Sequence, residues 1–127
     1  MGHQHAILLV DDQAENRDAM GFLLEQEGLR VRVAHDGQEA LEALHGGLRP
    51  CLVLVDLMMP RMDGWEFRQR QLSDPQFADI PVVVMSGYPN AQKAAAGLGV
   101  LDVLRKPLSR SALLTLVSDN CPASADA

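Results

Sequence analysis

Hydrophobic residues gather in short runs that are separated by segments of mixed character. Four runs are apolar at nearly every position: residues 6–10, 51–55, 80–85 and 100–104. Continuous runs of this length are typical of strands buried on both faces of a parallel sheet. Residues 29–34 instead alternate apolar side chains with Arg30 and Arg32. This alternation predicts a strand with one exposed face at a sheet edge.

The segments between and after these runs carry apolar residues at helical spacing. The predicted helices cover residues 14–27, 38–44, 63–72, 90–96 and a last stretch ending near residue 117. Gly28 is well placed to end the first helix, and Ser109 or Ser111 can cap the last. A helix follows each predicted strand, which favours an α/β fold with helices on both faces of a parallel sheet.

Length and composition are those of one globular domain. The chain has 127 residues, of which 47% are hydrophobic and 22% charged, and this size buries a core without disulfides or structural metals. We expect a folded domain over residues 6–118, with flexible ends at 1–5 and 119–127. Cys51 and Cys121 lie far apart in the sequence and suggest neither a disulfide framework nor a zinc site.

The charge narrows the range of partners. A formal net charge of −6 disfavours direct contact with nucleic acid or with an anionic membrane surface. The chain shows no signal-peptide pattern and no apolar run near the roughly 20 residues that span a bilayer. We therefore expect a soluble, cytoplasmic protein that is not inserted in a membrane.

Three carboxylates follow two of the predicted strands. Asp11 and Asp12 come directly after the first strand, and Asp56 comes directly after the third. Carboxyl ends of parallel strands share one edge of the sheet, and ligands bind where the strand order reverses. Crowded carboxylates repel one another, and a hard divalent cation such as Mg²⁺, or Mn²⁺, relieves that repulsion. An Asp carboxylate can also act as a nucleophile and form an aspartyl-phosphate.

Two further polar residues follow the remaining strands of the same series. Ser86 ends the fourth strand and Lys106 follows the fifth. Taken singly, paired Asp residues and a lone Ser more often cap helices, and a lone Lys is usually a solvated charge. Together they end successive strands at one edge, which indicates a phosphoryl-transfer site. There the ammonium and the metal offset charge on the phosphoryl group.

These motifs resemble those of the CheY-like response-regulator receiver family of two-component signalling. The most specific stretch is residues 56–64, Asp-Leu-Met-Met-Pro-Arg-Met-Asp-Gly. Asp11–Asp12, Ser86–Gly87 and Lys106–Pro107 follow the order and approximate spacing of the family, and the similarity covers residues 6–117. The resemblance implies a flavodoxin-like, doubly wound sheet of five parallel strands in the order 2-1-3-4-5.

The resemblance also implies a role for each site residue. Asp56 is the expected phosphorylation site. Mg²⁺ is expected on Asp12, on Asp56 and on the backbone carbonyl of Met58, with Asp11 acting mainly through water. Ser86 is the expected switch hydroxyl, and Lys106 the expected partner of phosphate or of unphosphorylated Asp56. Met58 and Tyr88 are expected to tune the rate of dephosphorylation. The peptide bond between Lys106 and Pro107 is expected to be cis.

The sequence departs from the family pattern around its fourth helix. Val103 stands three residues before Lys106, where Tyr or Phe is common, so a rotating ring cannot be the output mechanism. Gly87 stands where Ala is common, which favours a more mobile loop. The stretch 86–106 is about two residues shorter than usual, so we expect a shortened fourth helix or shortened loops, and an altered partner surface.

The expected partners are a histidine kinase or a histidine phosphotransfer protein, together with an unknown downstream protein. The output is expected to be contact with another protein, and the domain is expected to be a monomer or weak dimer. It is expected to autodephosphorylate but not to be a turnover enzyme on an external substrate. Three alternatives stay open on the residues alone: a stand-alone regulator, a phosphate shuttle or sink, and a receiver fragment of a hybrid histidine kinase.

Three other classes of protein fit the sequence less well. A phosphotransferase of the haloacid-dehalogenase type needs an acid two residues after its nucleophile, but Met58 follows Asp56 at that spacing and Gln13 follows Asp11. A flavodoxin needs a hydroxyl-rich phosphate loop after the first strand, where this chain has Asp11 and Asp12. A phosphorylation-silent interaction module is disfavoured because no residue of the expected site is missing.

Overall fold

A five-stranded parallel sheet forms the centre of the molecule. The computed structural model describes residues 6–59, 61–87, 91–106 and 108–121. The strands are β1 (Ala6–Val10), β2 (Arg30–Ala34), β3 (Leu52–Asp56), β4 (Val82–Ser86) and β5 (Asp102–Arg105), in the order β2-β1-β3-β4-β5. All neighbouring pairs are parallel. The predicted α/β class and strand order are confirmed, and the alternating segment is an edge strand.

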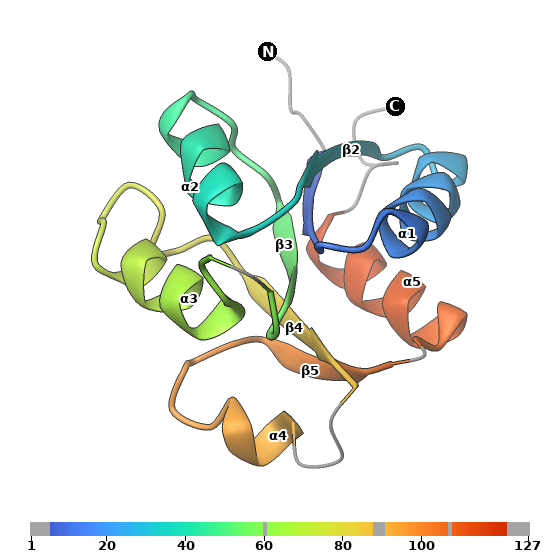
Figure 1. Cartoon of the computed structure of the whole chain (residues 1–127). Helices are drawn as coiled ribbons and strands as arrows, with labels where there is room; N and C mark the ends of the chain where they lie inside the picture. Colours follow the sequence, from blue (N-terminus) through green and yellow to red (C-terminus); the bar gives the residue numbers. More distant parts are fainter. Residues whose placement is uncertain (1–5, 60, 88–90, 107, 122–127) are drawn as a thin grey trace.

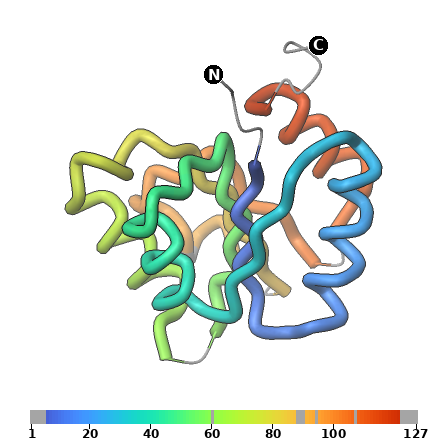
Figure 2. The backbone as a smooth tube through the Cα atoms, turned by 90° about the horizontal axis from the view of Figure 1, so that it is seen from above, coloured from blue at the N-terminus to red at the C-terminus, as the bar shows by residue number. Residues whose placement is uncertain are grey.

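Helices cover both faces of this sheet (Figures 1 and 2). The helices are α1 (Ala14–Gln26), α2 (Gly37–His45), α3 (Gly64–Leu72), α4 (Ala91–Ala94) and α5 (Arg110–Asn120). The helices α1 and α5 lie together on one face, and α2 and α3 lie on the other. The short α4 lies beside β5. Each strand is followed by one helix, so all strand ends that lead into a helix point to the same edge.

Two hydrophobic clusters pack against the two faces of the sheet. Along β1, Leu8 and Val10 join the cluster beneath α2 and α3, whereas Ile7 and Leu9 join the cluster beneath α1 and α5. These four side chains have no solvent exposure. Burial on both faces explains why the central strands read as continuous apolar runs rather than as alternating ones.

A buried polar network joins α3 to the loops before β4 and β5. Arg68, only 6% exposed, donates to the carbonyls of Leu98 at 2.9 Å and Gly99 at 2.8 Å. The amide of Gln71 donates to the carbonyls of Phe77 at 2.8 Å and Ile80 at 3.0 Å. These bonds give partners to the loop carbonyls, including those of the buried residues Phe77 and Leu98, and they anchor both loops to α3,.

The helix ends follow the expected capping chemistry. Gly28 has φ +86°, the left-handed conformation that ends α1,. The side chain of Ser109 accepts a hydrogen bond from the amide of Ala112 at 3.2 Å, so Ser109 rather than Ser111 caps α5. The helix α4 is four residues long, in agreement with the short segment expected there.

The carboxyl-terminal end differs from the prediction. The helix α5 continues to Asn120, beyond the expected end near residue 117 and past the expected domain boundary at 118. Cys121 is 2% exposed and forms a disulfide with Cys51, with the two Cα atoms 5.5 Å apart. The interpretation that these cysteines suggest no disulfide was wrong, because a strand start and a distant helix end meet only after the sheet has formed.

In the parts of the chain that the structure describes, none of the helices has both the length and the apolarity needed to cross a lipid bilayer.

Candidate functional site

The carboxyl ends of four strands bring the predicted site residues to one edge of the sheet. Asp11 follows β1, Asp56 ends β3, Ser86 ends β4 and Lys106 follows β5. The strands β1 and β3 are direct neighbours, so the strand order reverses between the connections that leave them. The site therefore lies at the position where doubly wound sheets bind their ligands.

The three predicted carboxylates converge. One oxygen from each of Asp11, Asp12 and Asp56 lies within 4.8 Å of the others. Asp11 is fully buried and Asp56 is 6% exposed, whereas Asp12 is exposed to solvent. A set of oxygen ligands with one open side fits a hard divalent cation that keeps several waters or binds a phosphate.

Lys106 supplies the positive charge of the cluster. Its ammonium Nζ donates to Asp56 Oδ2 at 2.8 Å and to Asp11 Oδ2 at 3.2 Å. Its backbone amide donates to the carbonyl of Ser86 at 2.8 Å, which ties the end of β5 to the end of β4. One ammonium thus bridges carboxylates that leave two different strands.

Burial and charge shift the pKa values of this pair. Burial raises the pKa of Asp56 above its ordinary value and the Asp11 carboxylate adds to that rise, although hydrogen bonds from Lys106 and from the Met58 amide oppose it. Burial acts to lower the pKa of Lys106, but its hydrogen bonds and charge interactions with Asp56 and Asp11 outweigh burial and raise it. Asp56 is thus a carboxylate whose negative charge is only partly compensated by its neighbours.

Local backbone bonds orient the carboxylates. The Met58 amide donates to Asp56 Oδ1 at 3.1 Å, and the Gln13 amide donates to Asp11 Oδ1 at 2.9 Å. Oδ2 of each carboxylate accepts a hydrogen bond from Lys106. Two contacts were not predicted: Asn16 Nδ2 reaches Asp11 Oδ2 at 3.4 Å, and the Arg17 guanidinium donates to the Asp11 carbonyl at 2.8 Å. Both residues belong to the first turn of α1. Their position in a helix that begins soon after Asp11 and Asp12 was the sequence feature that could have predicted these contacts.

The remaining predicted residues take different positions. Ser86 is buried, with 1% exposure, at the end of β4. The side chain of Met58 is 47% exposed beside the site. The predictions for Tyr88 and for the cis bond at Pro107 fall outside the described residues. Val103 lies on β5, in register with Val84, so this position holds no ring.

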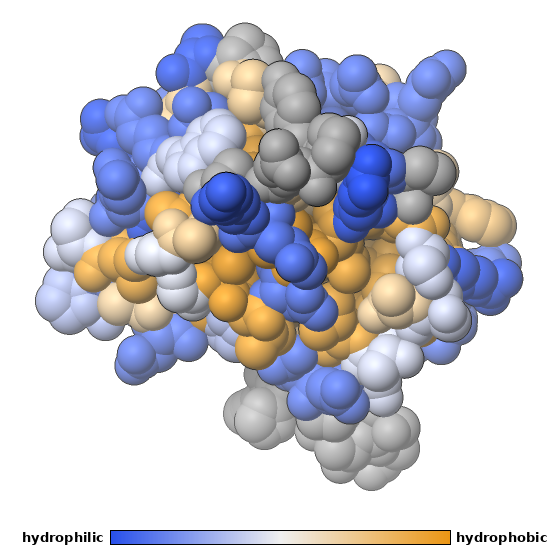
Figure 3. All heavy atoms as spheres, turned by 90° about the horizontal axis from the view of Figure 1, so that it is seen from below, coloured by the Kyte–Doolittle hydropathy of each residue, from blue (hydrophilic) through white to orange (hydrophobic). Residues whose placement is uncertain are grey.

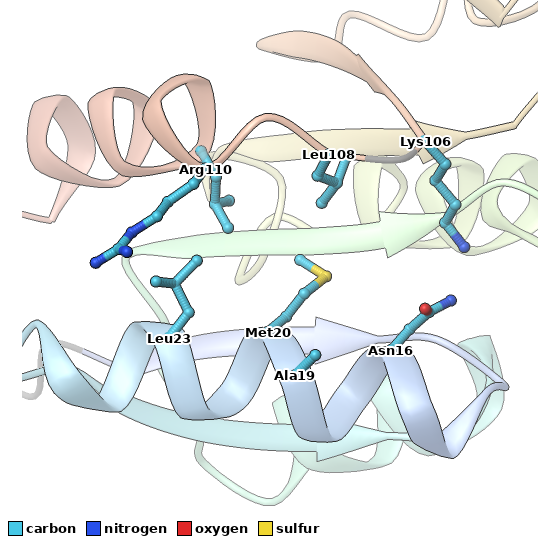
Figure 4. A pocket seen from close by; sticks show the side chains of 8 residues that line it. Asn16, Ala19, Met20, Leu23, Lys106, Leu108 and Arg110 are labelled. Carbon is cyan, nitrogen blue, oxygen red and sulfur yellow. The ribbon is translucent and has the colours of Figure 1, made fainter.

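A groove between α1 and α5 adjoins the site (Figure 4). Its volume is about 280 Å³. Lys106 and Asn16 lie at one end, and Leu23 and Arg110 lie at the other. Its lining is Asn16, Ala19, Met20, Leu23, Lys106, Leu108, Arg110 and Leu113. The site is therefore approachable from this side, with Lys106 shared between the groove and the carboxylates.

Comparisons with known proteins identify the family to which the chain is similar. The family model of the response regulator receiver domain matches residues 7–118. An uncharacterized 14.6 kDa protein from Leptolyngbya boryana is 38% identical over 120 residues, covering 93% of this chain and 91% of that protein. Response regulator MprA from Mycobacterium ulcerans is 37% identical over 85% of this chain but 46% of its own length, so the chain spans about half of that relative.

Solved structures show the same fold. A response regulator receiver protein from Pseudomonas putida superposes with a TM-score of 0.85 at 30% identity, covering 94% of this chain and 99% of that one. The signal receiver domain of a signal transduction histidine kinase from Syntrophus aciditrophicus gives a TM-score of 0.84 at 26% identity, covering 93% and 90%. With the family model matched over most of its length, the chain belongs to the response regulator receiver domain family, the signalling module of two-component systems.

Proposed function

We propose that this receiver domain accepts a phosphoryl group on the carboxylate of Asp56, from the phosphohistidine of a histidine kinase or histidine phosphotransfer protein. The observation that carries the proposal is the cluster itself. Three carboxylates lie with oxygens within 4.8 Å of one another, and an ammonium lies 2.8 Å from the proposed nucleophile. The proposed location of the protein is the cytoplasm, where it would receive phosphoryl groups from these donors.

The residues present fit Mg²⁺, and Mn²⁺ has similar ligand preferences. Asp11, Asp12 and Asp56, with the backbone carbonyl of Met58, are the proposed ligand set, and Asp11 acts mainly through water. When bound, the metal would offset negative charge on the phosphoryl oxygens. The exposed side of the cluster at Asp12 leaves room for the incoming phosphoryl group.

In the transfer step, a carboxylate oxygen of Asp56 attacks phosphorus opposite the donor nitrogen. The P–O bond forms and the P–N bond breaks, and the bonding electrons remain on the imidazole. Lys106 moves from its carboxylate partners to the phosphoryl oxygens and offsets their charge. Ser86 is the proposed hydroxyl donor to the same group. Water later hydrolyses the acyl phosphate, at a rate that Met58 and Tyr88 tune.

The proposed output is contact with a partner protein. Phosphorylation adds roughly −1.5 to −2 charge at the site, and the loop after Ser86 shifts to contact it, which raises the population of an active conformation. The face around α4 and β5, seen from below in Figure 3, gathers hydrophobic residues at its centre between polar ones. Leu101, directly before the edge strand β5, is 48% exposed. This face is the proposed partner surface.

Intact-mass spectrometry after incubation with acetyl phosphate tests the proposal. We expect a gain of one phosphoryl group that requires Mg²⁺ and disappears with chelator or in Asp56→Asn. Asp18→Asn, which removes an exposed carboxylate on α1, is the matched control and should phosphorylate normally. Full phosphorylation of Asp56→Asn would defeat the site assignment. No phosphorylation of the wild type under any condition would favour a silent interaction module.

The same chemistry fits a phosphate shuttle or sink, in which the phosphoryl group passes from Asp56 to a histidine of a second protein. Transfer from the phosphorylated domain back to a phosphotransfer protein, measured on a gel, distinguishes this alternative from a regulator whose phosphate is lost only to water.

A further inference from the structure

The backbone after Asp56 is held at several points. Residues 57–59 and 61–63, here called the acceptor loop, connect β3 to α3. The Gly64 amide donates to the Leu57 carbonyl at 2.9 Å, which closes the loop at its base. At its far side, the carbonyl of Met62 accepts from the amide of Gly37 at 3.1 Å. The loop is thus attached to the beginning of α2, an element that the site does not otherwise involve.

Arg61 makes the side-chain attachment of the loop to Asp36. Its Nε donates to Asp36 Oδ2 at 2.7 Å, and its terminal NH2 nitrogen donates to the same oxygen. Arg61 has φ +65°, and it is the one non-glycine residue with positive φ in the described part of the chain. An L residue pays an energetic penalty in this left-handed region and keeps it only where surrounding contacts demand it. The contacts that hold this segment are the ion pair to Asp36 and the bond from the Gly37 amide to the neighbouring Met62 carbonyl.

Asp36 is a rigid anchor for that pair. Its side chain is 4% exposed, and its Oδ1 accepts the Glu39 amide at 3.0 Å as the N-cap of α2. Its neighbour Gly37 has no room for a side chain, because an added Cβ would lie 2.9 Å from the Met62 carbonyl oxygen. A fixed carboxylate and a tight backbone contact therefore define where the acceptor loop can lie relative to α2.

We propose that Arg61 is a positioning residue for cation binding, which acts by fixing the acceptor loop through Asp36. This inference rests on the proposed function, in which the carbonyl of Met58 is a metal ligand. Met58 lies between the loop's base and Arg61, and its amide already binds Asp56. Releasing Arg61 leaves the Gly64–Leu57 and Gly37–Met62 bonds in place but removes the side-chain attachment nearest to Met58 on that side of the loop. The carbonyl is then no longer held toward the cation.

The sign of the effect separates this proposal from simple electrostatics. Arg61 carries a positive charge, so Coulomb's law alone predicts tighter Mg²⁺ binding when it is removed. Positioning predicts weaker binding. Arg70, which pairs with Glu66 on the exposed face of α3 at 2.8 Å, is the matched control because its removal changes the net charge equally.

Calorimetric titration with MgCl₂ alone measures the effect in the wild type and in variants. We expect Arg61→Ala to weaken Mg²⁺ binding about tenfold, in line with other residues that orient metal ligands, and Arg61→Lys to recover part of the loss. Asp36→Asn, which keeps an oxygen for the helix cap, should weaken binding as well. Combining it with Arg61→Ala should add little, because both changes break the same contact. Arg70→Ala should leave the dissociation constant within about twofold of the wild-type value, as expected for a screened surface charge.

Arg61→Gly separates positioning from a purely structural role. Glycine relieves the strain at φ +65°, so the melting temperature measured with chelator should not fall, whereas Mg²⁺ binding should still weaken. Unchanged or tighter Mg²⁺ binding in Arg61→Ala and Arg61→Gly would overturn the positioning role while leaving the proposed function intact. If the wild type itself binds no Mg²⁺, the proposed function fails, and with it the ligand whose position Arg61 would set.

Discussion

At the residue scale, the acidic site is defined by a charge balance that the protein alone does not complete. Asp11, Asp12 and Asp56 carry three carboxylates, and Lys106 bridges two of them. Burial raises the pKa of Asp56 despite that ammonium. A raised carboxyl pKa means that the ionised form is less favourable in the folded state than in the unfolded chain.

This imbalance predicts that removing the charge of Asp56 stabilises the metal-free protein. The raised folded-state pKa makes ionised Asp56 a destabilising group at pH values above that pKa, and the penalty fades as pH falls through it,. We expect Asp56→Asn to raise the free energy of unfolding by about 1 kcal/mol, the usual size of a single-residue effect. Urea denaturation at neutral pH with chelator measures it. A loss of stability would show that the ion pair with Lys106 outweighs burial.

The sequence identified these site residues because each directly follows or ends a strand. Strand ends are set by local apolar runs, so Asp11, Asp56 and Lys106 could be placed at one edge without coordinates. Arg61 could not be recognised in this way. Its partner Asp36 is 25 residues away, and the pair exists only because α2 and the acceptor loop are neighbours in the folded sheet. Its left-handed backbone could not be predicted either, because arginine, unlike glycine, does not indicate a positive φ.

At the element scale, the close approach of α3 to β3 fixes the backbone beside Asp56, the proposed phosphoacceptor. Gly64 is the first residue of α3, and a Cβ there would lie 2.9 Å from the Asp56 carbonyl oxygen and 2.9 Å from Leu57 Cα. Real Cβ contacts to backbone are essentially never so short. The helix therefore begins against the strand end that carries Asp56, which only a residue without a side chain permits.

Substitution at Gly64 should accordingly cost stability and disturb the site. We expect Gly64→Ala to lower the free energy of unfolding by about 1–3 kcal/mol, as for other overpacked positions, and to slow phosphorylation by acetyl phosphate. Gly87 has no atom within 4 Å of its added Cβ and no positive φ, so Gly87→Ala is the matched control and should be close to neutral. Equal effects of the two substitutions in thermal melts would argue against a specific contact at Gly64.

Element order followed from the sequence, whereas element ends did so only in part. The alternation of Arg30 and Arg32 with apolar residues located the edge strand, and Gly28 located the end of α1. The extension of α5 to Asn120 was not predicted, because residues 118–120 are polar and lack apolar periodicity. The helix is extended by tertiary contact, since Cys121 is buried against the cluster beneath α1 and α5.

At the scale of the whole molecule, the two ends of the sheet serve different purposes. The carboxyl ends of β1, β3, β4 and β5 carry the acidic site. At the opposite end, Cys51 immediately precedes β3, and its disulfide to Cys121 joins the start of that strand to the end of α5. The covalent link is thus separated from Asp56 by the length of β3. Stability and phosphoryl chemistry can therefore be tested independently.

The disulfide should contribute stability chiefly through the unfolded chain. It closes a loop with a sequence separation of 70 residues, and restricting such a long loop in the unfolded state is worth about 2–4 kcal/mol in typical proteins. We expect a reductant such as dithiothreitol to lower the free energy of unfolding by that amount. Cys51→Ser should show the same loss without reductant, and no further loss with it.

Phosphorylation provides the second readout. Because Cys51 and Asp56 lie at opposite ends of β3, we expect Cys51→Ser to be phosphorylated by acetyl phosphate to the wild-type extent at temperatures where it remains folded. Ser118→Ala, a change at an exposed position on α5, is the control for substitution near the helix end. If reduction left the free energy of unfolding unchanged, the disulfide would not stabilise the fold by restricting the unfolded chain. If it abolished phosphorylation of a protein still folded by circular dichroism, the two ends of the sheet would be coupled through β3 or α5. The strand end at Asp56 would then depend on how the strand begins.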